Sequence, residues 1–183
     1  MVENEHTVLT PGTIYIAYQG IGKSSTVNEC FGFIDLESSN FRLDDGYRPD
    51  EWYIYYGNLA FDLAAQGYSV FTSSHEPLRK YLYELRQKNP QVNVSIILPA
   101  FELKNEWIQR LQDRYNKNPT KKNQAALTGA TQYYESNIVD MLRDANDFGF
   151  DVIEIDTIDY RLIDILPLKD ENVALNRDFP EDE

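Results

Sequence analysis

The segment from Ala17 to Ser24 limits what this chain can fold into more than any other part of the sequence. It reads Ala-Tyr-Gln-Gly-Ile-Gly-Lys-Ser and directly follows the apolar run 13–16. A small residue, then four variable positions, then Gly-Lys-Ser is the pattern of a phosphate-binding loop between a strand and a helix. Gly20 and Gly22 can adopt backbone conformations closed to other residues, so that several N–H groups point at one anion. The pattern therefore predicts a strand, a phosphate-binding loop and a helix.

Each residue of this loop has an expected role. Lys23 would bring a mobile positive charge to the phosphates, and Ser24 would offer its hydroxyl to Mg²⁺. Residues 24–26 begin a helix whose N-terminal dipole favours negative charge. We expect ATP and Mg²⁺ to bind here, and the competing interpretation is an ordinary glycine-rich turn. The residues expected to bind the nucleotide are Gln19, Gly20, Ile21, Gly22, Lys23, Ser24 and Ser25.

The acidic composition disfavours some partners. The 183 residues include 30 Asp and Glu against 17 Lys and Arg, a formal net charge of -13. Nucleic acids are bound by net positive surface, so a nucleic-acid partner is disfavoured, whereas a nucleotide needs only a local positive pocket. The single cysteine, Cys30, excludes an internal disulfide and a thiolate zinc cluster and fits a reducing compartment. With Glu3 and Glu5 near the start and no long apolar run, we expect neither a secretory signal nor a membrane span, and hence a cytoplasmic protein.

One domain is expected over residues 1–169, because strand and helix patterns alternate without a linker. The expected strands are 13–17, 31–36, 68–72, 92–98 and 152–156. The expected helices are 23–30, 51–66, 77–89, 102–116 and 121–146. This alternation favours a doubly wound parallel sheet that binds ligands at the carboxyl ends of its strands. Residues 170–183 are rich in acids and are expected to form a flexible tail.

Two carboxylates stand at the end of the second expected strand. Asp35 and Glu37 are two residues apart, so in an extended strand both side chains project to the same side, close to the phosphate loop. Asp35 would support Mg²⁺ or orient the attacking oxygen, and Glu37 would hydrogen-bond the phosphoryl acceptor. Alternatively, both are solvated charges that close a strand.

Two arginines share one face of the helix expected over 102–116. Arg110 and Arg114 are four residues apart, and paired guanidinium groups suit a transferring phosphoryl group, whose charge is spread over several oxygens. The alternative is that they pair with Glu106 and Asp113 on a solvated helix. Because a polar segment broken by a proline follows, we expect a mobile lid over about 104–122.

Further candidates for contact with a phosphoryl acceptor lie near the third expected strand. Ser73, His75 and Arg79 follow this strand, and Ser73 and Arg79 would contact the acceptor. Ser73 could instead cap the next helix, and a histidine such as His75 is more typical of a surface or cap position. Tyr53 stands off the apolar stripe of helix 51–66, and we expect it to contact a nucleotide base.

These motifs resemble the P-loop kinases of small molecules, in particular the nucleoside monophosphate kinase group, its gluconate and shikimate kinase relatives and small kinase-like proteins of phages and bacteria. The loop resembles Pro-Gly-x-Gly-Lys-Ser-Thr, residues 33–37 resemble the shikimate kinase strand Phe-x-Asp-x-Asp, and residues 71–75 with Arg79 are similar to a Ser-rich segment of gluconate kinases. The resemblance covers about residues 13–157. It implies a three-layer α/β/α P-loop NTPase fold with strand order 2-3-1-4-5, and lid arginines at 110 and 114.

The expected activity is Mg²⁺-dependent transfer of the γ-phosphoryl group of ATP to a nucleoside or nucleoside monophosphate. Lys23, Asp35, Arg110 and Arg114 would be catalytic, Ser24 and Asp35 would hold the metal, and the enzyme would be a monomer or homodimer. Adenylate kinase itself is disfavoured because the third strand lacks an Asp-Gly-Phe-Pro-like segment, and a switch GTPase because no Asn-Lys-x-Asp signature occurs. A kinase of a sugar acid or polyol and a non-catalytic ATP-binding module remain alternatives.

Overall fold

The centre of the molecule is a parallel sheet of five strands. The computed structural model describes residues 11–42 and 47–167. Its strands are β1 (Thr13–Ala17), β2 (Phe33–Asp35), β3 (Ser69–Thr72), β4 (Asn93–Pro99) and β5 (Asp151–Ile155). Neighbouring strands all pair in parallel, in the order β2-β3-β1-β4-β5. The predicted parallel sheet and its strand order are confirmed, whereas the predicted tail, residues 170–183, lies outside the described residues.

The helices fall where the apolar patterns predict them. They are α1 (Lys23–Glu29), α2 (Trp52–Ala65), α3 (Glu76–Lys88), α4 (Lys104–Lys117), α5 (Lys121–Phe148) and α6 (Leu162–Ile165), with 3₁₀ helices η1 (Ser38–Phe41) and η2 (Phe101–Leu103). The hydroxyl of Thr120 caps α5 by accepting from the backbone N–H of Asn123. The short elements η1, η2 and α6 were not predicted, because three or four residues are too few to show a helical period. Within the described residues, no helix combines the length and apolar character needed to cross a membrane.

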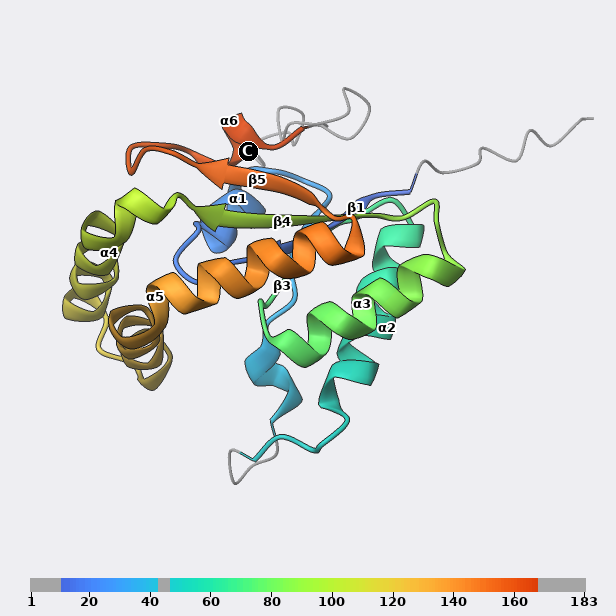
Figure 1. The fold of residues 1–183 in the computed structure, drawn as a ribbon, viewed down its shortest axis with the longest axis horizontal. Helices are drawn as coiled ribbons and strands as arrows, with labels where there is room; N and C mark the ends of the chain where they lie inside the picture. The colour runs from blue at the N-terminus through green and yellow to red at the C-terminus, as the bar shows by residue number, and fades with distance from the viewer. Residues whose placement is uncertain (1–10, 43–46, 168–183) are drawn as a thin grey trace, which may run out of the picture.

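Helices cover both faces of the sheet. In Figure 1 the long α5 lies in front of the sheet and α1 lies behind it. Parallel strands that are covered on both faces read as continuous apolar runs, and Ile14, Tyr15 and Ile16 of the central β1 are indeed at most 2% exposed. The arrowheads of β4 and β5 point toward α4, so the carboxyl ends of the strands face this helix.

Strand β2 is shorter than the predicted 31–36. Phe31 is 62% exposed and Gly32 has a φ of +87°, so the extended segment begins after them, although the carbonyl of Gly32 still accepts a hydrogen bond from Ser69 N–H of β3 at 2.9 Å. Among the described residues the strand pairs with β3 alone, and after its last residue one further hydrogen bond, from Leu36 N–H to the carbonyl of Phe71, continues the ladder. The chain therefore leaves the sheet just after Asp35, which places this carboxylate at the edge where the loop after β1 also emerges.

Candidate functional site

The loop between β1 and α1 has the backbone conformation that its glycines predict. Gly20 and Gly22 have φ of +84° and +101°, a region that side-chain-bearing residues rarely adopt. The loop also packs tightly, because a Cβ at Gly20 would lie 2.8 Å from Cδ2 of Leu111 in α4. Both glycines are therefore required by the shape of the loop.

Two aromatic side chains hold the loop by its carbonyl groups. Trp107 Nε1 of α4 donates to the carbonyl of Gln19 at 2.9 Å, and the Tyr160 hydroxyl donates to the carbonyl of Ile21 at 2.7 Å. In a trans peptide the N–H points opposite to the C=O, so the N–H groups of residues 20 and 22 point away from these aromatic rings. Within the described residues no hydrogen bond uses either N–H. The loop thus presents two free amides, as binding of an anion requires.

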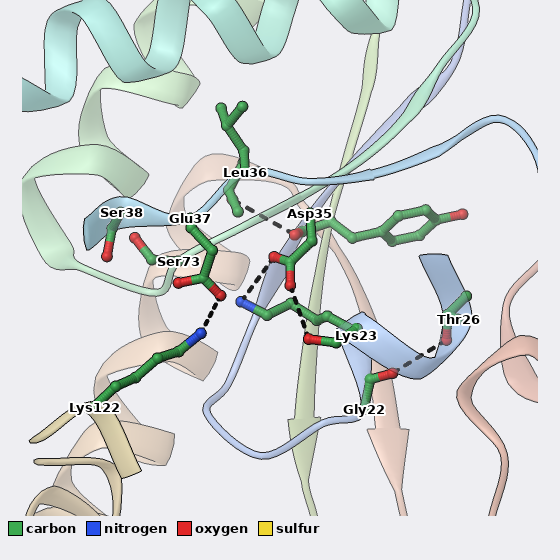
Figure 2. A network of polar contacts seen from close by, with 12 residues as sticks. Gly22, Lys23, Thr26, Asp35, Leu36, Glu37, Ser38, Ser73 and Lys122 are labelled. Atoms are coloured by element: carbon green, nitrogen blue, oxygen red, sulfur yellow. Dashed lines mark hydrogen bonds and ion pairs between the residues drawn. The ribbon is translucent and has the colours of Figure 1, made fainter. Parts of the chain in front are cut away.

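Lys23, Ser24 and Asp35 meet beside this loop. Lys23 Nζ lies 3.5 Å from Asp35 Oδ1, and the Ser24 hydroxyl lies 3.5 Å from Asp35 Oδ2, as Figure 2 shows. The carboxylate is mostly buried, and its Oδ1 accepts no hydrogen bond within the described residues. A buried carboxylate oxygen without a hydrogen-bond donor is suited to a cation.

The donor set fits Mg²⁺ only together with phosphate. No cluster of three or more His, Cys, Asp or Glu side chains suited to a metal occurs in the described part of the chain. Ser24 and Asp35 supply hard oxygen donors, the type that Mg²⁺ prefers, and Mg²⁺ commonly takes its remaining ligands from substrate phosphates and water. These two residues could therefore supply two of the oxygen ligands of a metal ion that is also bound to a nucleotide.

Glu37 is linked to the amino end of α5. Lys122 forms an ion pair with its carboxylate across the site (Figure 2). Partial burial favours the neutral acid, but the hydrogen bond from Lys122 and the positive charges of Lys122, Lys23 and Arg114 outweigh it, so that the pKa of Glu37 lies below its ordinary value. Glu37 is therefore ionised at neutral pH and already has a cationic partner.

Arg110 lies against the phosphate loop. A Cβ at Gly22 would be 3.9 Å from its Nη2, and its Nη1 donates to the carbonyl of Ile158 at 3.3 Å. The guanidinium carbon lies 5.1 Å from the ring centre of Tyr160 and 5.5 Å from that of Trp107. These contacts hold the guanidinium in place beside the loop.

Arg110 and Arg114 line a groove between α4 and the start of α5. The groove has a volume of about 1090 Å³, and Lys117 and Lys122 also line it. The loop residues themselves are not among its lining residues, so the groove adjoins the loop and does not contain it. The alternative of ion pairs with Glu106 or Asp113 is not observed, because within the described residues neither arginine forms an ion pair.

The segment expected as a lid is largely a packed helix. Residues 104–117 form α4, in which Trp107 and Leu111 are at most 1% exposed. Only the turn from Asn118 to Thr120 separates α4 from α5. This burial ties α4 to the core, and the expectation of a mobile lid over 104–122 stays untested.

Arg79 occupies a different place from the expected one. Its Nε and Nη2 contact Asp144 Oδ2 at 2.7 and 2.6 Å, its Nη1 donates to the carbonyl of Ser74, and the residue is 4% exposed. This buried ion pair joins α3 to α5 and leaves no exposed guanidinium for an acceptor. The predicted contact of Arg79 with substrate therefore gains no support from its described contacts.

Tyr53 and Ser73 differ in their position relative to the site. The ring of Tyr53 packs edge-on against Trp52 and Tyr81, on the α2–α3 side, and none of its ring contacts involves the loop. Contact with a base therefore gains no support from the described contacts of Tyr53. Ser73 lies directly after β3, where its N–H donates to the Tyr56 hydroxyl at 3.0 Å, and it remains at the edge expected for an acceptor.

The site includes residues that sequence reasoning did not select. Trp107 was assigned only to a helix pattern, and Tyr160, Lys122 and Arg48 were not considered. Tyr160 offered one signal, because it follows the carboxyl end of the last strand, where ligands of parallel sheets bind. The contacts of Lys122 and Arg48 cross 85 and 27 residues of sequence and have no local pattern.

No protein-family model and no curated protein sequence matches this chain.

Replacing Trp107 by phenylalanine is expected to weaken MgATP binding by about tenfold, because the carbonyl of Gln19 loses its donor and the loop is no longer held. Isothermal titration calorimetry measures the affinity. Trp52→Phe, which alters an indole in the α2–α3 cluster, serves as the control and should bind as the wild type does. Unchanged affinity in Trp107→Phe would show that the indole does not position the loop.

Proposed function

We propose that this protein is a Mg²⁺-dependent kinase that transfers the γ-phosphoryl group of ATP to a small acceptor, most simply a nucleoside or nucleoside monophosphate. The observation that carries the proposal is the loop at residues 19–24. Its two free amides, the ammonium group of Lys23 and the Ser24–Asp35 pair converge at the carboxyl end of β1. Amides, a lysine and a hydroxyl beside a carboxylate are the groups needed to hold a triphosphate and its metal.

Local charge supports a polyanionic ligand. The chain as a whole carries a formal net charge of -13. Around the loop, however, Lys23, Arg110, Arg114 and Lys122 gather from three helices, and within the described residues the two arginines have no acidic partner. Unpaired arginines in an acidic protein are suited to a phosphorylated ligand, because planar guanidinium groups bind several oxygens at once.

Each group near the loop has its own expected role in the reaction. The amides of residues 20 and 22 and Lys23 would hold the β- and γ-phosphates, and Ser24 and Asp35 would hold Mg²⁺, which neutralises phosphate charge. Arg110 and Arg114 would stabilise negative charge on the transferring group. The carboxylates at the end of β2 would face the acceptor, where Asp35 can orient its hydroxyl oxygen.

The test is ADP formation from MgATP with a panel of nucleosides, nucleoside monophosphates, sugar acids and polyols. We expect acceptor-dependent ADP release that EDTA abolishes, and a decrease of about 10²-fold in Asp35→Asn. Asp156→Asn, which changes the exposed carboxylate after β5, is the matched control and should keep full activity. Tight ATP binding without acceptor-dependent turnover, together with no effect at Asp35 or Arg110, would instead indicate a non-catalytic ATP-binding module.

A further inference from the structure

A chain of hydrogen bonds joins the carboxyl ends of β2 and β3 beside the proposed site. Arg48 Nη2 donates to the Ser38 hydroxyl oxygen at 2.9 Å, and Arg48 Nη1 lies 2.9 Å from His75 Nε2. On the other side of the ring, His75 Nδ1 lies 2.9 Å from the Ser73 hydroxyl oxygen. Figure 2 shows Ser38 and Ser73 close to Glu37. Both hydroxyls therefore lie beside Glu37 at the carboxyl ends of β2 and β3.

The direction of these hydrogen bonds follows from the chemistry of the groups. A guanidinium only donates, so His75 Nε2 must accept from Arg48. A neutral imidazole carries one proton, and with Nε2 as the acceptor the proton sits on Nδ1, which then donates to Ser73. Each serine oxygen thus accepts from a nitrogen, Ser38 from Arg48 and Ser73 from His75. The hydroxyl hydrogens of both serines are left to donate elsewhere.

Packing around the ring, together with the surrounding positive charges, keeps His75 neutral. Although the residue lies at the exposed rim of the site, loss of water from its ring by packing, followed by the positive charges of Arg48, Arg42, Arg79 and Lys23, lowers the pKa of His75 to about 4. No proton is therefore added to Nε2 near neutral pH, and the arrangement persists.

Packing against α2 holds the chain of hydrogen bonds in place. The guanidinium carbon of Arg48 lies 4.5 Å from the ring centre of Trp52, and this indole meets the His75 ring edge-on at 5.2 Å. The fully buried Tyr56 donates to the carbonyl of Leu36 and accepts from the N–H of Ser73. The ends of β2 and β3 are therefore joined through side chains that have little freedom to rearrange.

We propose that Arg48 and His75 are positioning residues that set the hydroxyls of Ser38 and Ser73 to donate to the phosphoryl acceptor. The part of the acceptor that these two hydroxyls contact carries oxygens that accept hydrogen bonds and have no hydrogen to donate, as in a carboxylate or a phosphate. Arg48 is assigned a role through Ser38 and His75, because two of its five N–H groups donate to these side chains. This inference deepens the proposed function and rests on it, because the protein has a phosphoryl acceptor only if it is a kinase. The geometry of the hydrogen bonds can nevertheless be tested without turnover.

The first test is the protonation of the His75 ring, measured by ¹⁵N–¹H NMR. His6→Gln leaves His75 as the single histidine of the full chain. We expect the proton on Nδ1 in this protein, and a mixture of both tautomers when Arg48→Gln is added, with folding checked by near-ultraviolet circular dichroism. A proton on Nε2 in the His6→Gln protein would overturn the proposal, whether or not the protein is a kinase.

The second test is the kind of group that binds. Inorganic phosphate, gluconate and the uncharged polyol ribitol are titrated separately into the His6→Gln protein while the His75 ring signals are followed. We expect phosphate or gluconate to shift these signals and ribitol to leave them unchanged, and the two anions distinguish a phosphate from a carboxylate. The shift should disappear in Ser73→Ala, which leaves the phosphate loop intact. A ring that responds to neither anion, or equally to ribitol, would overturn the proposed ligand class.

The third test uses turnover with the acceptor that the ADP panel identifies. His75→Ala should raise KM for this acceptor by about tenfold, with kcat and KM for ATP nearly unchanged, because one hydrogen bond to the acceptor is lost. His75→Asn keeps an N–H near the place of Nδ1 and should restore most of the affinity. Equal behaviour of the two variants would show that donation to Ser73 is unimportant.

Discussion

Lys23→Ala is expected to lower turnover by about 10³-fold or more while the fold is retained. In the structure the ammonium group stands at the loop and contacts the carboxylate of Asp35 at 3.5 Å. Its removal takes away the positive charge nearest the two free loop amides and the cationic partner of Asp35. The loss of charge stabilisation in the transition state corresponds to roughly 4 kcal/mol.

The measurement is acceptor-dependent ADP release at saturating MgATP. Lys80→Ala removes a lysine from an exposed ion pair with Glu76 and should leave turnover unchanged. Circular dichroism and the unfolding midpoint verify that both variants remain folded. Turnover near the wild-type level in Lys23→Ala would contradict the assignment of the loop as the phosphate site.

Arg79→Ala is expected to destabilise the protein by about 3–5 kcal/mol, because the buried Asp144 loses its short contacts with Arg79 and keeps only the longer ion pair with Arg143, at 3.7 Å. Both side chains of this pair are about 5% exposed, and Arg79 also donates to the carbonyl of Ser74. Urea unfolding measures the change, and Lys80→Ala, which breaks an exposed pair, should cost far less. The double variant Arg79→Met, Asp144→Leu should recover much of the stability, since no unpaired charge remains.

This prediction separates a structural role of Arg79 from contact with substrate. A stable Arg79→Ala protein with a raised KM for the acceptor would show that the guanidinium serves the substrate. A destabilised protein that binds the acceptor normally at low temperature would show that it serves the packing of α3 against α5.

Local patterns were sufficient for the main elements of the fold. The strands and long helices lie within a few residues of the predicted ranges, because apolar runs between helical patterns identify strands that are covered on both faces. The exceptions are instructive. Strand β2 begins only at Phe33, because the positive φ of Gly32 is not an extended conformation, and helix α4 is part of the core because its own Trp107 is buried.

The candidate site was predictable where a local pattern in the sequence marked its residues. The loop at residues 19–25 was identified from its glycines, and Asp35 from its place at a strand end, and the structure brings Asp35 to Lys23 and Ser24. The buried ion pair of Arg79 was not predicted, because its partner Asp144 lies 65 residues away.

The amino-acid sequence by itself determined the alternation of strands and helices and the loop in which glycines must take positive φ, since both depend on residues that are neighbours along the chain. Only the tertiary structure decided which side chains hold that loop and which are joined at the ends of β2 and β3. Trp107 and Tyr160 reach the loop carbonyls, and Arg48 reaches His75, across 88, 139 and 27 residues. Such hydrogen bonds depend on how the packed sheet and helices orient distant groups, because their short range and strict direction are satisfied only once the chain is folded.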